Sequence, residues 1–242
     1  MSSSSSQTIP TLTFYHFSES CSFTVRVLLN ELSLPFSSVK MIMDYTTFAM
    51  TPTDSSLSVE EYRSKVHHMG YVPGLRLNFP EDGSETSLTE TPAILSYLIS
   101  LVPEKETELL GKTQLEKHKS LAWLIWLSGA LHAQGYGPFF VPGRYISTDD
   151  EKEVERVKKA AVKKIESCYE SIEKRIPDGG KYFQGGDEVT VVDLNAYIFW
   201  RWGKKNGFEM DKYPKYSGVC KRVEGRESVR RSLEEEGLEA LF

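Results

Sequence analysis

The feature that most constrains the fold is the order strand, helix, strand within residues 11–43. Residues 11–17, TLTFYHF, are β-branched and aromatic, which is typical of a β-strand. The next segment carries an apolar face at helical spacing, formed by Val25, Leu28, Leu29 and Leu32. Pro35 ends that helix, and residues 36–43 supply a second apolar stretch of strand length. This β-α-β order predicts two parallel strands with the helix packed against them.

A hairpin and a second helix complete a small first module. Residues 70–79 and 85–88 flank the turn-forming sequence PEDG, and this pattern predicts two antiparallel strands. Thr91 can cap a helix whose first position is Pro92, a residue favoured at that position. The module therefore spans residues 11–102.

The remainder of the chain is predicted to be helical. Apolar residues recur every three or four positions along residues 151–174, with Lys and Glu between them. Thr190 and Asp193 form a capping box that starts another helix. Gly225 interrupts two short helices near the end of the chain. Residues 115–131 are apolar on most sides, which favours a helix between neighbours or in a subunit contact rather than a surface helix.

The expected fold class is α/β followed by all-α. We expect a disordered tail at residues 1–10, an α/β domain at 11–102, an extended charged linker at 103–112 and an all-α domain at 113–242.

Composition excludes several classes of function. The chain has 242 residues and a formal net charge of −5, and nucleic-acid binding needs a basic surface. No apolar run approaches the roughly 18 residues that span a bilayer, so we expect no membrane partner. Three cysteines do not form a disulfide framework, which favours reduced thiols and a cytoplasmic location. His67 and His68 lack neighbours at ligand spacing, so no metal site is expected.

Three stretches of the first module resemble the soluble glutathione transferase superfamily: SCSFTVRVLL at 20–29, GYVPGLRL at 70–77 and SLTETPAILSYL at 87–98. The first is similar to the helix-one signature of the zeta class. In the second half, ALHAQGYGPFFVPGRY at 130–145 and YFQGGDEVTVVDLNAYIFWRW at 182–202 are similar to the bacterial beta class. The resemblance implies a thioredoxin-like glutathione-binding domain, an all-helical substrate domain and a homodimer.

This resemblance places a glutathione site at the start of the first helix. Glutathione reacts as its thiolate, whereas a cysteine-like thiol has a pKa of about 8.5, so the protein must stabilise the anion. A helix amino end contributes about 0.3–1 kcal/mol, and charge-assisted hydrogen bonds supply more. The donors implied at this place are the catalytic candidates Ser20, Cys21 and Ser22.

The flanks of glutathione have their own candidates. The resemblance implies a cis peptide bond before Pro73, which would turn the backbone of Val72 outward to pair with the peptide. Thr91 and Glu90 would hold the γ-glutamyl carboxylate and ammonium. The full set of implied glutathione-binding residues is His68, Tyr71, Val72, Pro73, Glu90 and Thr91.

The leading hypothesis is a transferase that adds glutathione to a small electrophilic, largely apolar substrate, in detoxification or secondary metabolism. The implied second-substrate pocket is formed by His132, Tyr136 and Phe139. One alternative is a glutathione-dependent cis-trans isomerase of an unsaturated acid. Another is a thioltransferase with Cys21 as nucleophile, although Thr24 stands where a resolving cysteine would be. The last is a non-catalytic ligand-binding protein, favoured by Glu19 in place of the zeta-class serine.

Overall fold

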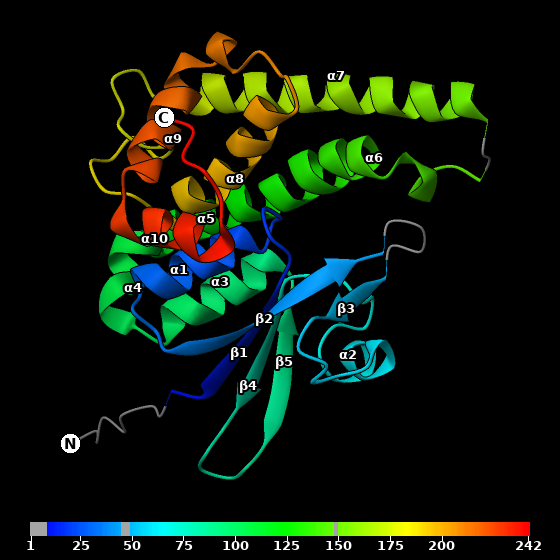
Figure 1. Ribbon diagram of the computed structural model, residues 1–242. Helices are drawn as coiled ribbons and strands as arrows, with labels where there is room; N and C mark the ends of the chain where they lie inside the picture. The colour runs from blue at the N-terminus through cyan, green and yellow to red at the C-terminus, as the bar shows by residue number, and fades with distance from the viewer. Residues whose placement is uncertain (1–8, 45–48, 148–149) are drawn as a thin grey trace. The chain divides into compact units, whose positions relative to one another are not determined.

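The computed structural model describes residues 9–44, 49–147 and 150–242 (Figure 1). The chain forms two compact units. Unit 1 runs to Glu106 and also contains Glu227–Ala240, and unit 2 comprises Thr107–Arg226 with Leu241–Phe242. The expected disorder of the tail at 1–10 falls almost wholly outside the described residues.

Unit 1 contains a mixed five-stranded sheet in the order β3-β2-β1-β4-β5. Its strands are β1 (Thr11–His16), β2 (Phe36–Met43), β3 (Met50–Pro52), β4 (Gly74–Asn78) and β5 (Glu85–Thr89). β1 and β2 are parallel, with Leu12 opposite Phe36, while β4 is antiparallel to both β1 and β5. The predicted β-α-β unit and hairpin are therefore confirmed. β3, antiparallel to β2, was not expected.

The helices of unit 1 are α1 (Phe23–Glu31), α2 (Val59–Lys65), α3 (Thr91–Ser100) and α10 (Glu227–Glu236) (Figure 1). Successive side chains of β1 point to opposite faces of the sheet. One face contacts α1, and the other contacts α2. Phe14 lies under the Arg26 guanidinium of α1, at 5.6 Å, whereas Tyr15 packs against Tyr62 of α2. The predicted apolar face of α1 is fully buried at Val25, Leu28 and Leu29.

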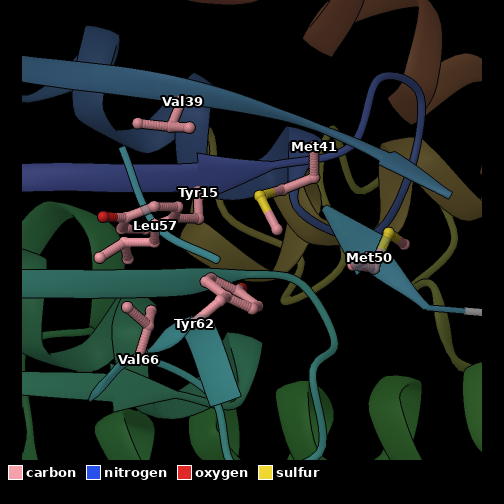
Figure 2. Close-up of a cluster of buried hydrophobic side chains, with 7 residues drawn as sticks. All are labelled: Tyr15, Val39, Met41, Met50, Leu57, Tyr62 and Val66. Atoms are coloured by element: carbon pink, nitrogen blue, oxygen red, sulfur yellow. The ribbon is translucent and has the colours of Figure 1, made fainter. Parts of the chain in front are cut away.

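The core beneath α2 is shown in Figure 2. It comprises Tyr15, Val39, Met41, Met50, Leu57, Tyr62 and Val66. Gly74, at the start of β4, is small for a packing reason. A Cβ atom there would lie 2.6 Å from Val66 Cγ1 and 3.0 Å from Tyr62 Oη. α2 therefore approaches β4 as closely as a glycine permits.

Unit 2 and the segment leading into it are helical. The helices are α4 (Pro103–Leu110), α5 (Gln114–Trp126), the π-helix η1 (Leu127–Tyr136), α6 (Gly137–Phe140), η2 (Pro142–Arg144), α7 (Glu151–Arg175), α8 (Val191–Lys205), η3 (Met210–Lys212) and α9 (Pro214–Glu224). The expected extended linker at 103–112 is wrong, because Leu109 and Leu110 are buried on a helix there. The two final helices are separated at Gly225, as predicted.

α8 is the buried helix of unit 2, and its capping box is confirmed. The carboxylate of Asp193 is fully buried and accepts hydrogen bonds from Thr190 N, Thr190 Oγ1 and Phe183 N, at 2.7, 2.7 and 2.8 Å. Since the donors come from two segments, this carboxylate fixes the loop before α8 as well as the start of the helix.

α5 carries exposed apolar residues. Leu115 and Ile125 are 66% and 56% exposed in the single chain, and Leu121 is also exposed, so the described residues do not enclose this helix, and the alternative of a subunit contact stays a prediction. Its apolar sequence is explained only in part by packing within unit 2, where Leu124 is buried.

α10 belongs to unit 1, whereas the sequence prediction assigned residues 113–242 to one helical domain. The physical reason is a set of polar contacts with α1. Asn30 Nδ2 donates to Ser232 Oγ at 2.9 Å, and Arg26 Nη1 pairs with Glu235 at 3.1 Å. No helix among the described residues is long and apolar enough to cross a bilayer.

Candidate functional site

The amino end of α1 is shaped by a network of serines. The Ser22 side chain is fully buried; its hydroxyl donates to Phe17 O at 3.0 Å and accepts from Phe17 N at 3.2 Å. Ser20 Oγ lies 2.6 Å from Ser22 Oγ and accepts from Ser22 N at 3.1 Å. Because the Ser22 proton is directed at Phe17 O, the Ser20 hydroxyl is the donor of the pair. Ser22 thus holds the loop, and Ser20 must rotate its proton away before it can donate to a ligand.

Cys21 lies between this loop and the strand β4 entry. Its side chain is 9% exposed, and its thiol is 3.5 Å from Val72 O. Burial raises the pKa of the Cys21 thiol to about 12; the nearby Thr91 side chain lowers it and the charge of Glu90 raises it further. At neutral pH, Cys21 is therefore a protonated thiol that can donate a hydrogen bond but is a poor nucleophile.

The segment before β4, residues 71–73, is held by a hydrogen bond from a side chain of α2. The Val72–Pro73 peptide bond is cis, as the resemblance implied. Tyr62, which is fully buried, donates its hydroxyl to Tyr71 O at 2.6 Å, one residue before Val72. Sequence patterns gave no role to Tyr62, since a buried aromatic on a short helix is usually only core.

The amino end of α3 differs in detail from the expectation. Glu90 is the residue before the helix, exposed and with a φ of 68°, and Thr91 is its first residue. Thr91 is therefore not the cap; its side chain is 7% exposed and lies within reach of the Cys21 thiol. The structure brings together Cys21, Val72, Glu90 and Thr91 around one point of unit 1.

The two adjacent histidines occupy different environments. His67 is buried, and its Nδ1 accepts from Met69 N at 3.3 Å. His68 is exposed and stacks on His67 with ring centroids 5.6 Å apart, while Tyr71 lies 5.7 Å from His67 on another side. Burial lowers the pKa of His67, and Glu90 partly opposes this shift. His67 is thus electrostatically linked to Glu90. Of the two histidines, the sequence resemblance implied only His68 as a glutathione-binding candidate.

The second-substrate candidates lie in unit 2. Tyr136 is fully buried, and its hydroxyl pairs with the hydroxyl of Tyr169. It therefore offers no side-chain surface, which corrects its assignment as a pocket wall. His132 lies 5.3 Å from the ring of Trp202, and burial lowers its pKa to about 4. Phe139 is partly exposed and packs edge-on against Tyr136.

Within residues 9–44, 49–147 and 150–242, no group of three or more His, Cys, Asp or Glu side chains is arranged to hold a metal ion. The site described above rests instead on hydroxyls, a neutral thiol and backbone groups.

Unit 1 has a thioredoxin-like sheet with a cis-proline close to the start of α1, and unit 2 is helical. Residues 131–236 match the family model described as glutathione S-transferase, C-terminal domain. This matched segment covers most of unit 2 and α10.

Individual proteins are similar to this chain over most of its length. The chain is 22% identical over 219 residues to glutathione S-transferase GST-4.5 of Xanthomonas campestris pv. campestris, covering 90% of this chain and 95% of that protein. The bacterial beta-class glutathione S-transferase of Sphingomonas chungbukensis has a TM-score of 0.73 and 25% identity, covering 94% of this chain and all of that one. A glutathione transferase homologue from Sulfitobacter, solved with bound glutathione, has a TM-score of 0.76 and 21% identity, covering 96% and 100%.

Proposed function

We propose that this protein is a glutathione transferase that seats glutathione on unit 1 and joins its sulfur to a small, largely apolar electrophile. The observation that carries the proposal is the convergence of Cys21, Val72 and Thr91 at the amino end of α1, with Cys21 Sγ 3.5 Å from Val72 O. The Sulfitobacter homologue, which has the same fold, binds glutathione.

The residues fit the three parts of the tripeptide. The backbone of Val72 is suited to pair with the central cysteine, and the exposed Glu90 to meet the γ-glutamyl ammonium. That ammonium would also neutralise a charge that opposes ionisation nearby, since Glu90 raises the pKa of Cys21. Thr91, at the first position of α3, is suited to the γ-glutamyl carboxylate, and His68 and Tyr71 to the glycine end.

Thiol activation is within the reach of these groups. Lowering a thiol pKa by two units requires about 2.7 kcal/mol. The amino end of α1 supplies about 0.3–1 kcal/mol, and one hydrogen bond to an ionised group about 1.5–3 kcal/mol. Ser20, after rotating its hydroxyl away from Ser22, or the neutral Cys21 thiol provides that bond.

In the proposed reaction the glutathione thiol loses its proton to solvent, and the resulting thiolate forms a carbon–sulfur bond with the electrophile. In a displacement, the leaving group departs with its electron pair. In an addition to a conjugated double bond, the carbanion takes a proton from solvent. His132 and Phe139 of unit 2 are proposed to contact this second substrate, His132 as a neutral imidazole.

We further propose a cytoplasmic homodimer. The three cysteines are free and buried, which suits a reducing compartment. The exposed apolar residues Leu115, Leu121 and Ile125 of α5 suit a contact with a second copy. Light scattering of the purified chain tests this part, and a monomer at micromolar concentration would refute it.

The function is tested with a panel of electrophiles and mass detection of products, using the wild type, Ser20→Ala and Cys21→Ala, with Cys168→Ala as a matched cysteine control in unit 2. We expect a conjugate of glutathione, a loss of rate in whichever of Ser20→Ala and Cys21→Ala removes the activating hydrogen bond, and a near-normal rate in Cys168→Ala.

Other outcomes identify the alternatives. Turnover of an unsaturated acid without consumption of glutathione would indicate an isomerase. Activity confined to mixed disulfides and abolished by Cys21→Ala would indicate a thioltransferase. Absence of glutathione binding by calorimetry at millimolar ligand would leave a non-catalytic ligand-binding protein.

A further inference from the structure

The loop before Ser20 adopts a backbone conformation that needs external support. Glu19 has a φ of 56°, in the left-handed region that residues with a side chain rarely adopt. This residue immediately precedes Ser20 and Cys21, so its backbone conformation determines the positions of their Cα atoms. A group that stabilises Glu19 in this state therefore also fixes the amino end of α1.

That group is the carboxylate of Glu236, the last residue of α10. Glu236 Oε2 accepts from Glu19 N at 2.9 Å, and its backbone oxygen accepts from Ser18 Oγ at 3.1 Å. The Glu236 side chain is completely buried. A residue 217 positions away in sequence thus bonds directly to the strained backbone.

Glu236 is itself held in place by two basic side chains. Arg26 Nε donates to Glu236 Oε1 at 3.1 Å, and His16 Nδ1 lies 3.4 Å from the same oxygen. Arg26 Nη2 is 2.8 Å from His16 Nε2. Arginine can only donate, so His16 accepts at Nε2, and its Nδ1 lies near Glu236 without a hydrogen bond of good geometry. Although burial opposes ionisation, the nearby His16, the Glu19 N–H and the charge of Arg26 lower the pKa of Glu236.

Docking of α10 does not by itself explain this carboxylate. An acid in the last turn of a helix is disfavoured by the helix dipole, and burial disfavours its charge further. The neighbouring Glu235 already pairs with Arg26 at 3.1 Å and accepts from Asn30 at 3.1 Å while remaining partly exposed. The two acids share Arg26 as a partner, but Glu236 alone also bonds to the loop, through Glu19 N and Ser18 Oγ.

We propose that Glu236 is a positioning residue of the glutathione site, which holds the Ser18–Glu19 backbone so that Ser20 and Cys21 face the glutathione sulfur. This role rests on the proposed function, because it concerns the activation of that sulfur. Glu236 touches neither glutathione nor the electrophile in this scheme; it acts through Glu19.

The test compares Glu236→Ala, Glu236→Gln and the matched control Glu235→Ala, each as the full chain. The first readout is the pKa of the bound glutathione thiol, followed by the ultraviolet absorbance of the thiolate as a function of pH. The second is amide hydrogen exchange of residues 17–23 without ligand. The third is the separation of KM from kcat for an electrophile that the wild type conjugates.

We expect Glu236→Ala to raise the bound thiol pKa by about one unit, a tenfold change in ionisation. The Glu19 amide should exchange faster, and the electrophile KM should stay unchanged. If the bound thiol pKa rises from about 6.5 to about 7.5, the thiolate fraction at about pH 7 falls from about three quarters to about one quarter, so kcat should fall about threefold. Glu236→Gln keeps an amide oxygen for Glu19 N–H and should recover part of the loss. Glu235→Ala should change neither the thiol pKa nor the Glu19 exchange.

Equal effects of Glu235→Ala and Glu236→Ala would overturn the proposal, because they would show a general role of α10 docking. An unchanged thiol pKa in a folded Glu236→Ala or Glu236→Gln would overturn it as well. Failure of the wild type to bind glutathione would refute the proposed function instead, and exchange at Glu19 would still decide whether Glu236 holds the loop.

Discussion

The buried Cys21 thiol leads to a quantitative prediction about reactivity. With a pKa of about 12, Cys21 is ionised in roughly one molecule in 30,000 at about pH 7.5, whereas a free cysteine of pKa about 8.5 is ionised in roughly one in 11. Alkylation proceeds through the thiolate, so the native Cys21 should react about 3,000-fold more slowly than the same cysteine in the unfolded chain.

The assay is labelling with iodoacetamide at about pH 7.5, in buffer and in concentrated urea, with each cysteine-containing peptide quantified by mass spectrometry. Cys220, which is fully buried in unit 2, serves as an internal reference for a thiol with no proposed role. If native Cys21 reacted within about tenfold of its unfolded rate, the assignment of a neutral thiol would be wrong. A nucleophilic Cys21 and the thioltransferase mechanism would then become the better account.

Three other predictions concern stability. Gly74→Ala should cost about 1–3 kcal/mol in urea unfolding because its Cβ meets the core beneath α2, whereas Gly129→Ala, with open space around it, should not destabilise the chain. Asp193→Ala removes the acceptor of three hydrogen bonds and should lower the free energy of unfolding by at least about 3 kcal/mol. The control Asp187→Ala, on the exposed surface, should change it by no more than about 0.5 kcal/mol. Equal losses in the two variants would contradict the role of the capping box. His132 has its pKa lowered to about 4, so the unfolded chain binds a proton first as the pH falls below about 6.5, and up to about 3 kcal/mol of stability should be lost between these values. That loss should be absent in His132→Phe, and an equal acid dependence in both proteins would refute the assignment.

The parts of the fold that follow from short-range patterns could be predicted from the sequence. The β-branched and aromatic residues of β1, the apolar face of α1 and the capping box at Thr190 are each local signals, and the corresponding elements are present in the structure. The helix α4 was missed because its charged sequence was interpreted as an extended connection, although Pro at the first position and glutamates in the first turn are compatible with a helix; only its packing buries Leu109 and Leu110. β3 has three residues, too few for a periodic signal.

The candidate site divides in the same way. Motif resemblance indicated Cys21, Val72 and Thr91, and the structure places them together. The resemblance could not indicate that the Ser22 hydroxyl would be occupied by two hydrogen bonds to the backbone of Phe17, since Ser20 and Ser22 are the same residue type two positions apart. Nor could a local pattern connect Glu19 to Glu236, because a hydrogen bond across 217 residues is specified only by the tertiary fold.

The placement of α10 in unit 1 has a consequence for the order of events during synthesis. The ribosome completes the strands and α1 well before α10, with residues 107–226 between them. At about 5–20 residues per second, translating this segment takes about 6–24 s. Throughout that interval the nascent amino-terminal unit lacks Glu235 and Glu236. The guanidinium of Arg26 therefore lacks the two carboxylates with which it pairs in the finished protein. The loop at residues 17–22 can therefore reach its final form only when nearly the whole chain has been made.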